Sequence, residues 1–383
     1  VVASATTGAN GTGAYPIAGV LPGTYTARTS NPLGYNDQLF NNVTCVGCPV
    51  TAGTAIAVAA GQTSANINFV LSVGGRVSGA VTAAGSTTPL PGVTVAVFNQ
   101  RNQFVTSTTT NSSGLYETSG IPAGTYFVKP TANGGGYVNQ LYSGIACDGC
   151  PAIGGTPVVV AGTGTTSGIN FALTTGGVIS GSLTNASFQP LVGVTVRILN
   201  AGSETVATGV TDANGAYSLP GLPTGRYWVR TANSASLIDR IYSSTTSGGA
   251  VCLACGSGAG TPIAVTAGSI VRAIDFVLTA GGSIAGTITG DGAPLVNAGV
   301  LIYRANNVLV QEVFTNALGA YQTTSGLPAG NYFVRTRNGQ GFNDELYNDN
   351  GCVGCLPNSG VAVPVTIGTP VTGIDFILVK GGW

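Results

Sequence analysis

One long stretch recurs along this chain, and it constrains the fold more than any other feature. Its clearest copy contains Gly114–Cys150, and the same order of glycine, tyrosine, proline and a Cys-x-x-Cys pair returns from Gly215, from Gly319 and, near the start, from Gly13. The first cysteines of the copies stand at 45, 147, 252 and 352, so the period is 100 to 105 residues. Solenoid units are about 20–50 residues long, so this period predicts one domain per copy.

The repeat predicts four domains in the 383-residue chain, each large enough for its own core. The predicted borders are 1–73, 74–175, 176–280 and 281–383, and these ranges are called repeats 1 to 4 below. A Gly-Gly pair joins each repeat directly to the next, which predicts a fairly stiff rod without flexible linkers. Repeat 1 is incomplete, because Val1 corresponds to the strand expected at residues 105–110 and the opening segment has no counterpart.

Repeat 2 shows the expected strands most clearly. Apolar residues alternate in GGRVSGAVTAAG, through Val77 and Val81, and in GVTVAVFN, through Val93, Val95 and Val97. Turn signals separate about seven such segments, and no window carries a capped helical pattern. The sequence therefore predicts an all-β fold, a tandem array of Ig-like Greek-key β-sandwich domains.

The composition excludes several classes of function. Charged residues are 7% of the chain and the net charge is zero, against about 25% charged residues in ordinary soluble domains. So few charges give little repulsion between copies, which favours self-assembly; a secreted protein coated with Ser, Thr and Asn is the alternative. The sequence has no basic patch for nucleic acid and no apolar run of about 18 residues that would span a membrane. A start at Val1, without Met or a signal peptide, fits a processed exported protein or a fragment.

Three short motifs carry a family resemblance across the repeats. They are GVTV at Gly92–Val95 and Gly193–Val196, Gly-x-Tyr at Tyr116, Tyr217 and Tyr321, and a Pro-to-Tyr turn at Pro122–Tyr126, Pro223–Tyr227 and Pro328–Tyr332. The chain resembles the carboxypeptidase regulatory-like domain and the related B-type repeats of bacterial surface adhesins. The resemblance implies a prealbumin-like sandwich without a catalytic site of its own, used in accessory, structural or adhesive proteins.

The repeated tyrosines are expected to be part of the scaffold. Their rings should pack in the sandwich while their hydroxyls bond the backbone, as in a tyrosine corner. A stacking platform for sugars is the alternative role for the same rings.

Each repeat carries one Cys-x-x-Cys pair, and we expect each pair to form a local structural disulfide that pins a long loop. The eight residues are Cys45, Cys48, Cys147, Cys150, Cys252, Cys255, Cys352 and Cys355. A redox motif would need a helix N-terminus to lower the thiol pKa, and zinc would need four ligands in a chain without histidine. Metal binding, redox activity and bonding between subunits stay open as alternatives.

A second small motif precedes each cysteine pair. It holds Asp37, Asp239 and Asp344, with Asn139 in repeat 2. One carboxylate per loop is few for Ca²⁺, which takes six to eight oxygens, so a turn satisfied by its own side chains is the favoured interpretation over a cation site. Asp212, in TDANG, is interpreted as a turn residue in the same way.

We expect no catalysis and no cofactor, because the chain has no histidine and no carboxylate pair recurs between repeats. The prediction is a secreted, bacterial cell-surface structural protein, the subunit of a self-assembling filament or stalk. Its partners would be copies of itself, with a cell-surface or glycan ligand also possible for the chain. The incomplete repeat 1 is the predicted subunit junction. The alternatives are an adhesin or carbohydrate-binding segment of a larger protein, and an accessory region of an exported hydrolase.

Overall fold

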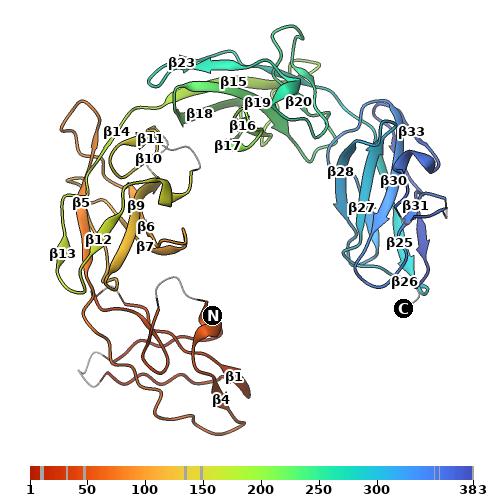
Figure 1. Cartoon of the computed structure of the whole chain (residues 1–383). Coiled ribbons are helices and arrows are strands. Elements are labelled where there is room, and N and C mark those ends of the chain that lie inside the picture. Colours follow the sequence, from red (N-terminus) through yellow and green to blue (C-terminus); the bar gives the residue numbers. More distant parts are fainter. Residues whose placement is uncertain are drawn as a thin grey trace. The chain divides into compact units, whose positions relative to one another are not determined.

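The computed structural model describes residues 1–8, 13–31, 33–45, 49–132, 136–146, 150–348, 350–352 and 354–381. The chain forms two compact units, Val1–Thr175 and Gly176–Trp383, and each is described by itself. The described residues are strands and loops apart from short 3₁₀ turns, so the predicted all-β fold is confirmed (Figure 1). Those turns are η1 (Val50–Ala52), η2 (Ala152–Gly154), η3 (Ser257–Ala259) and η4 (Pro357–Ser359).

Repeat 2 consists of two sheets, and its opening strand β5 (Arg76–Ala83) is the centre of the first. On one side β5 pairs antiparallel with β8 (Leu115–Glu117), and on the other it pairs parallel with β13 (Thr165–Thr166) and β14 (Phe171–Leu173). The second sheet has the order β12-β9-β6-β7. Its strands are β6 (Thr94–Phe98), β7 (Phe104–Thr109), β9 (Gly124–Ala132) and β12 (Val158–Val160), and a small hairpin of β10 (Gln140–Leu141) and β11 (Ile145–Ala146) follows β9.

Repeats 3 and 4 have the same arrangement. In repeat 3 the opening strand β15 (Gly177–Asn185) pairs with β18 (Ala216–Leu222), β23 (Ile270–Val271) and β24 (Phe276–Leu278). The second sheet of repeat 3 contains β16 (Thr195–Leu199), β17 (Thr205–Val210), β19 (Gly225–Ala232), β20 (Arg240–Ile241), β21 (Ala250–Val251) and β22 (Ile263–Val265).

In repeat 4 the opening strand β25 (Ser283–Gly290) pairs with β26 (Ala293–Pro294), β29 (Ala320–Gln322), β34 (Pro370–Val371) and β35 (Phe376–Leu378). The second sheet of repeat 4 contains β27 (Gly299–Arg304), β28 (Leu309–Phe314), β30 (Gly330–Arg337), β31 (Glu345–Leu346), β32 (Asn350–Gly351) and β33 (Val363–Val365). In both repeats, therefore, the opening strand again lies between its antiparallel and parallel partners.

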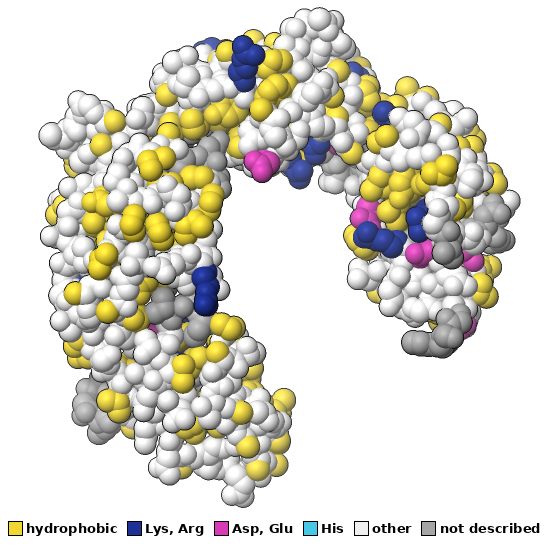
Figure 2. Space-filling view, viewed as in Figure 1, with side chains coloured by type: hydrophobic (Ala, Val, Ile, Leu, Met, Phe, Trp, Pro, Cys, Tyr) yellow, Lys and Arg dark blue, Asp and Glu magenta, His cyan; other side chains and the backbone are white. Residues whose placement is uncertain are grey.

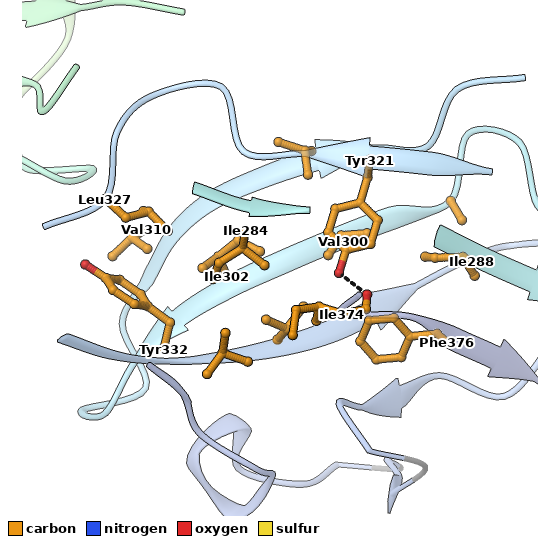
Figure 3. Close-up of a cluster of buried hydrophobic side chains, with 14 of the residues drawn as sticks. Ile284, Ile288, Val300, Ile302, Val310, Tyr321, Leu327, Tyr332, Ile374 and Phe376 are labelled. Carbon is orange, nitrogen blue, oxygen red and sulfur yellow. Dashed lines mark hydrogen bonds between the residues drawn. The ribbon is translucent and has the colours of Figure 1, made fainter. Parts of the chain in front are cut away.

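The core of each complete repeat lies between its two sheets. Figure 3 shows the core of repeat 4, where Ile284 and Ile288 of the opening strand face Val300 and Ile302 of β27, and all four are fully buried. The predicted alternation in repeat 2 is confirmed, because Val77, Val81, Val93, Val95 and Val97 are all buried. Removing this apolar surface from water stabilises each sandwich by roughly 25 cal/mol per Å².

Repeat 1 lacks this two-sheet core. Its strands pair as β1 (Gly23–Tyr25) with β4 (Ile56–Val58), and β2 (Gln38–Leu39) with β3 (Val43–Thr44). The described residues of 13–20 and 62–71 form no strand, although their counterparts in repeat 2 flank the opening strand. Among the described residues of repeat 1, Leu39 is the one buried apolar side chain.

Candidate functional site: repeat junctions and disulfide loops

In the first unit, repeats 1 and 2 are joined by close backbone contact. The N–H of Gly74, in the Gly-Gly pair, donates to the carbonyl of Gly34 at 2.9 Å. Gly120, in the turn before β9, packs on the same carbonyl, and a Cβ added to Gly120 would lie 2.1 Å from the Gly34 oxygen. The glycines are required here because the two backbones approach too closely for a side chain.

The second unit repeats this junction between repeats 3 and 4. The N–H of Gly281 donates to the Ser236 carbonyl at 2.9 Å, and the N–H of Gly326 donates to the Leu237 carbonyl at 2.9 Å. A Cβ on Gly326 would lie 2.3 Å from the Ser236 oxygen. Leu253, from the disulfide loop of repeat 3, is buried in the apolar cluster of repeat 4. Within each unit, consecutive repeats are thus held by direct contacts rather than by a linker.

Each repeat carries its cysteine pair in a loop, and Leu253 brings the loop of repeat 3 against repeat 4. Cys252 is bonded to Cys255 and Cys352 to Cys355, with Cα–Cα distances of 5.2 and 5.3 Å. Cys45 and Cys150 are also disulfide-bonded, whereas Cys48 and Cys147 lie outside the described residues. That all four pairs brace their loops stays a prediction.

The surroundings of the disulfides bear on the redox and metal alternatives. The Cys252 loop follows the two-residue strand β21 and precedes the three-residue turn η3, so no α-helix N-terminus is present there to lower a thiol pKa. The Cys352 loop has the same neighbours in β32 and η4. Over the part of the chain that the structure describes, no three His, Cys, Asp or Glu side chains come together as a metal site.

A cation from the second sheet holds the disulfide loop, and the sequence analysis missed it. Lys129 Nζ donates to the Cys150 carbonyl at 2.9 Å, and Arg230 Nη1 donates to the Cys255 carbonyl at 3.0 Å. Burial lowers the pKa of both Lys129 and Arg230. The available signal was a cation at the same place in every repeat, five residues after the turn glycine: Arg28, Lys129, Arg230 and Arg335.

The aspartates that were candidate cation ligands are used inside their own loops. Asp239 Oδ1 accepts from Asn233 Nδ2 at 2.7 Å and from Thr231 Oγ1 at 3.0 Å. Burial raises the pKa of Asp239, although these hydrogen bonds act in the opposite direction. The backbone carbonyl of Asp239 also accepts from the Cys252 N–H at 2.8 Å, so the carboxylate loop positions the disulfide.

The other copies of this loop support the same interpretation. Asp37 and Asp344 each accept from an asparagine six residues earlier, at 2.9 Å in both loops. Asn139 takes the corresponding place in repeat 2. Asp212 accepts from the N–H groups of Asn214 and Ala216, which makes TDANG a turn.

The repeated tyrosines fasten the backbone, as predicted. The hydroxyls of Tyr116, Tyr217 and Tyr321 donate to the carbonyls of Ile169, Ile274 and Ile374 at 2.6, 2.7 and 2.6 Å. Those of Tyr126, Tyr227 and Tyr332 donate to the carbonyls of Pro122, Pro223 and Pro328 at 2.9 Å. All six rings are buried, which leaves no stacking face for a sugar at these residues.

The comparisons with known proteins give a family and a set of distant structures. The model of the family described as carboxypeptidase regulatory-like domain matches residues 76–174 and 178–279, just over half of the chain. No curated protein matches the chain. Among the described residues, no helix is long and apolar enough to cross a membrane.

Three of the solved structures that match share little sequence identity with this chain. The Bacillus anthracis TIE protein is 18% identical, with a TM-score of 0.23, over 80% of this chain and 50% of its own. A streptococcal ancillary pilin is 14% identical, with a TM-score of 0.22, over 80% of this chain and 99% of its own. The shaft pilin SpaA from Lactobacillus rhamnosus GG is 10% identical, with a TM-score of 0.22, over 55% of this chain and 99% of its own. The chain spans half the length of the first of these, and TM-scores this low carry no argument about function.

Proposed function

Because the chain belongs to the carboxypeptidase regulatory-like domain family, we propose that it is a non-enzymatic extracellular structural protein. Its four repeats are tandem domains of the sandwich type, the first of them incomplete, and copies of the chain assemble into a filament or a surface stalk. The function is mechanical: the domains form a stiff array, and the array joins to other copies of itself.

The repeat junction is the observation that supports this proposal most. In both units, a Gly-Gly pair donates to the loop of the preceding repeat, and a turn glycine of the next repeat packs on the same loop. Such contacts replace a flexible linker by a fixed backbone register, which suits a protein that bears load along its length.

The surface chemistry supports association between copies. Figure 2 shows few charged side chains on the face in view, scattered among neutral and apolar ones. With 7% charged residues and a net charge of zero, copies repel one another weakly.

Repeat 1 is the proposed subunit junction. Leu21, Leu33 and Val70 are exposed at 75%, 71% and 75%. Covering such side chains is favourable by about 25 cal/mol per Å² of apolar surface.

The disulfides support an oxidising, extracellular location, and the proposal places the protein at a bacterial cell surface. The proposal extends the bond to all four Cys-x-x-Cys pairs. Alkylation of the intact protein without reductant should modify no cysteine, and after reduction it should modify eight. Free thiols before reduction would contradict this part of the proposal.

Electron microscopy of the purified chain tests the assembly. We expect regular fibres whose length grows with protein concentration. Short, separate rods at all concentrations would contradict the proposal, and specific binding of those rods on a glycan array would favour an adhesin instead.

A further inference from the structure

The outer face of the second sheet of repeat 3 gathers three arginines that are separated in the sequence. Arg226 and Arg230 lie on β19 with Trp228 between them, and the residues that alternate with these three are buried in the core of repeat 3. Because alternate side chains of a strand point to opposite sides, all three point outwards. Arg197 of β16 lies directly opposite Arg230 in the antiparallel register. We call these four residues the arginine face.

No acid of the described residues forms an ion pair with the arginine face. The ion pairs of the described residues are Arg76–Glu117, Arg337–Glu312 and Lys380–Asp291. Asp239 attracts Arg230, but its carboxylate already accepts two hydrogen bonds inside its own loop. Burial and the charge of Arg197 outweigh that attraction and lower the pKa of Arg230. Within the part of the chain that the structure describes, the positive charge of this face is therefore not neutralised.

Arg197 is a cost to the sheet rather than a requirement of it. Like charges that lie directly opposite on neighbouring strands destabilise the pair. In the other complete repeats the cation of the second sheet lies opposite an uncharged residue, Lys129 opposite Ala96 and Arg335 opposite Leu301. Lys129 holds its disulfide loop without a second cation opposite. The fold of the repeat therefore does not need a cation at position 197.

Arg226 is also particular to repeat 3. Its counterparts, which follow the same turn glycine, are Thr125 in repeat 2 and Asn331 in repeat 4. In each repeat this residue lies opposite the middle residue of a three-residue strand, so the comparison holds in space as well as in sequence. In a chain with 7% charged residues, two additional arginines on one face of one repeat indicate a charged ligand.

The spacing of the cations selects the kind of anion. Arg226 and Arg230 are four residues apart on an extended strand, about 13 Å between Cα atoms, whereas Arg197 is about 5 Å from Arg230. A ligand that reaches all three arginines needs several negative groups along a chain. Guanidinium groups bind carboxylates through paired hydrogen bonds, and the half-buried ring of Trp228 offers an apolar surface between the charges. Sugar rings with carboxylate substituents combine these features, because one face of such a ring presents C–H groups.

A nucleic acid fits this face less well. A duplex carries one charge per about 1.7 Å, and proteins that bind nucleic acid present broad basic surfaces. Repeat 3 has five arginines and four acidic residues, a net charge of +1. The arginine face is thus a short basic row in a nearly neutral domain, which suits a polymer of lower charge density.

We propose that the arginine face of repeat 3 binds an acidic polysaccharide, with carboxylates at Arg197, Arg226 and Arg230 and a sugar ring against Trp228. The polymer would run along β19. The inference goes beyond the proposed function and does not depend on it, since a filament and a separate rod would both carry this face.

Titration of the full chain with a short oligogalacturonate, followed by calorimetry and by tryptophan fluorescence, tests the inference. Trp228 and Trp383 are the two tryptophans of the chain, so Trp383→Phe makes the fluorescence report on Trp228. We expect saturable binding of oligogalacturonate that changes this fluorescence and weakens with added salt. A neutral maltooligosaccharide of equal length should not bind. Failure of oligogalacturonate to bind would overturn the proposal.

Two single variants with the same loss of charge locate the site. Arg226→Thr copies repeat 2 and should weaken binding about fivefold, as expected for one exposed ion pair. Adding Arg197→Ala, which also copies repeat 2, should bring the loss to about twentyfold. The control is Arg272→Thr, which removes an exposed arginine that follows β23 of the first sheet and should leave binding unchanged. Equal losses in Arg226→Thr and Arg272→Thr would overturn the arginine face as the site.

Two further measurements identify the ligand and the site without any variant. A single-stranded DNA oligonucleotide of equal charge should bind more weakly than oligogalacturonate, and equal or tighter binding of the DNA would overturn an acidic polysaccharide as the ligand. Hydrogen exchange of the unchanged chain should slow in β16 and β19 when oligogalacturonate is added, and stay the same in their counterparts β6 and β9. Equal slowing in both pairs of strands would overturn the assignment to repeat 3.

Discussion

Repeats 1 and 4 share part of one chain plan, but residues 1–73 contain no counterpart of two strands of repeat 4, β25 and β27. In repeat 4, β25 brings Ile284 and Ile288 into the core, and Phe376 is 1% exposed. Among the described residues of repeat 1 no such strand is present, and Phe69, the counterpart of Phe376, is only half-buried. The two strands at the centres of the two sheets therefore decide whether the remaining alternating residues form a dry core.

The loops respond differently from the core. Asp37 in repeat 1 accepts from Asn31 just as Asp344 in repeat 4 accepts from Asn338, at 2.9 Å in both cases. The partners are six residues apart, so this bond closes without help from distant strands. Polar loops held by short-range bonds thus persist where the sandwich, which needs pairing between distant strands, is incomplete.

The largest difference is expected for the core phenylalanines. Phe376→Ala should destabilise repeat 4 by about 3–5 kcal/mol, because it removes a fully buried ring and leaves a cavity. Phe69→Ala should cost about 1 kcal/mol, since part of that ring is already in water. Hydrogen exchange measured by mass spectrometry reads the two repeats separately. Equal losses would show that repeat 1 has a core of its own.

The disulfides should give the next largest effect. Replacing Cys252 and Cys255 together by serine should cost about 2 kcal/mol, the entropy of closing a four-residue loop. The loop also carries Leu253, which is buried against repeat 4, so its loosening should expose that cluster to hydrogen exchange. The same double change at Cys45 and Cys48 should disturb only its own loop. A spread of exchange from repeat 1 into repeat 2 would contradict this.

The tyrosine bonds come third. Tyr321→Phe should cost about 1 kcal/mol, because it removes a buried hydrogen bond to the Ile374 carbonyl (Figure 3). Tyr15→Phe should cost less, since its ring is less buried.

Tyr321 should also make the stability of repeat 4 depend on pH in the alkaline range. Burial raises the pKa of Tyr321 above its ordinary value of 10.0, so the unfolded chain loses this proton first. Stability from this group is therefore complete below about pH 10 and is lost as the pH rises toward the folded pKa. Urea titrations at several alkaline pH values should show that the free energy of unfolding falls less steeply with pH in Tyr321→Phe than in the unchanged chain. An equally steep fall in both proteins would contradict the assignment of this pH dependence to Tyr321.

The sequence predicted most of the local structure, since alternation at Val93, Val95 and Val97 and the Gly-x-Tyr turns are short-range signals. It also predicted the hydroxyl bond of Tyr116, although the partner Ile169 is 53 residues away. It did not predict that β5 pairs parallel with β14, nor that Arg230 holds the Cys255 carbonyl, because both depend on how distant strands pair. The junction glycines could be seen in the sequence, but only the structure shows that Gly120 and Gly326 are needed for close backbone approach.

The smallest effect is expected in the polar loops, where the two regions should behave alike. Asp37→Asn and Asp239→Asn should each change stability by less than about 1 kcal/mol, since asparagine keeps an acceptor oxygen and Asn139 already stands at this place in repeat 2.

Burial raises the pKa of Asp239, so the folded state holds its proton to higher pH than the unfolded state. The associated stability is present at low pH and declines as the pH rises through the folded pKa. Asp239→Asn should therefore reduce the loss of stability of repeat 3 as the pH rises above the ordinary carboxyl pKa of 3.8, measured by hydrogen exchange at matched intrinsic rates. Asn139→Asp, the reverse change, should introduce such a loss in repeat 2. If Asp37→Asn alone unfolds repeat 1, the loops depend on the missing strand after all, and the contrast between local and long-range contacts fails.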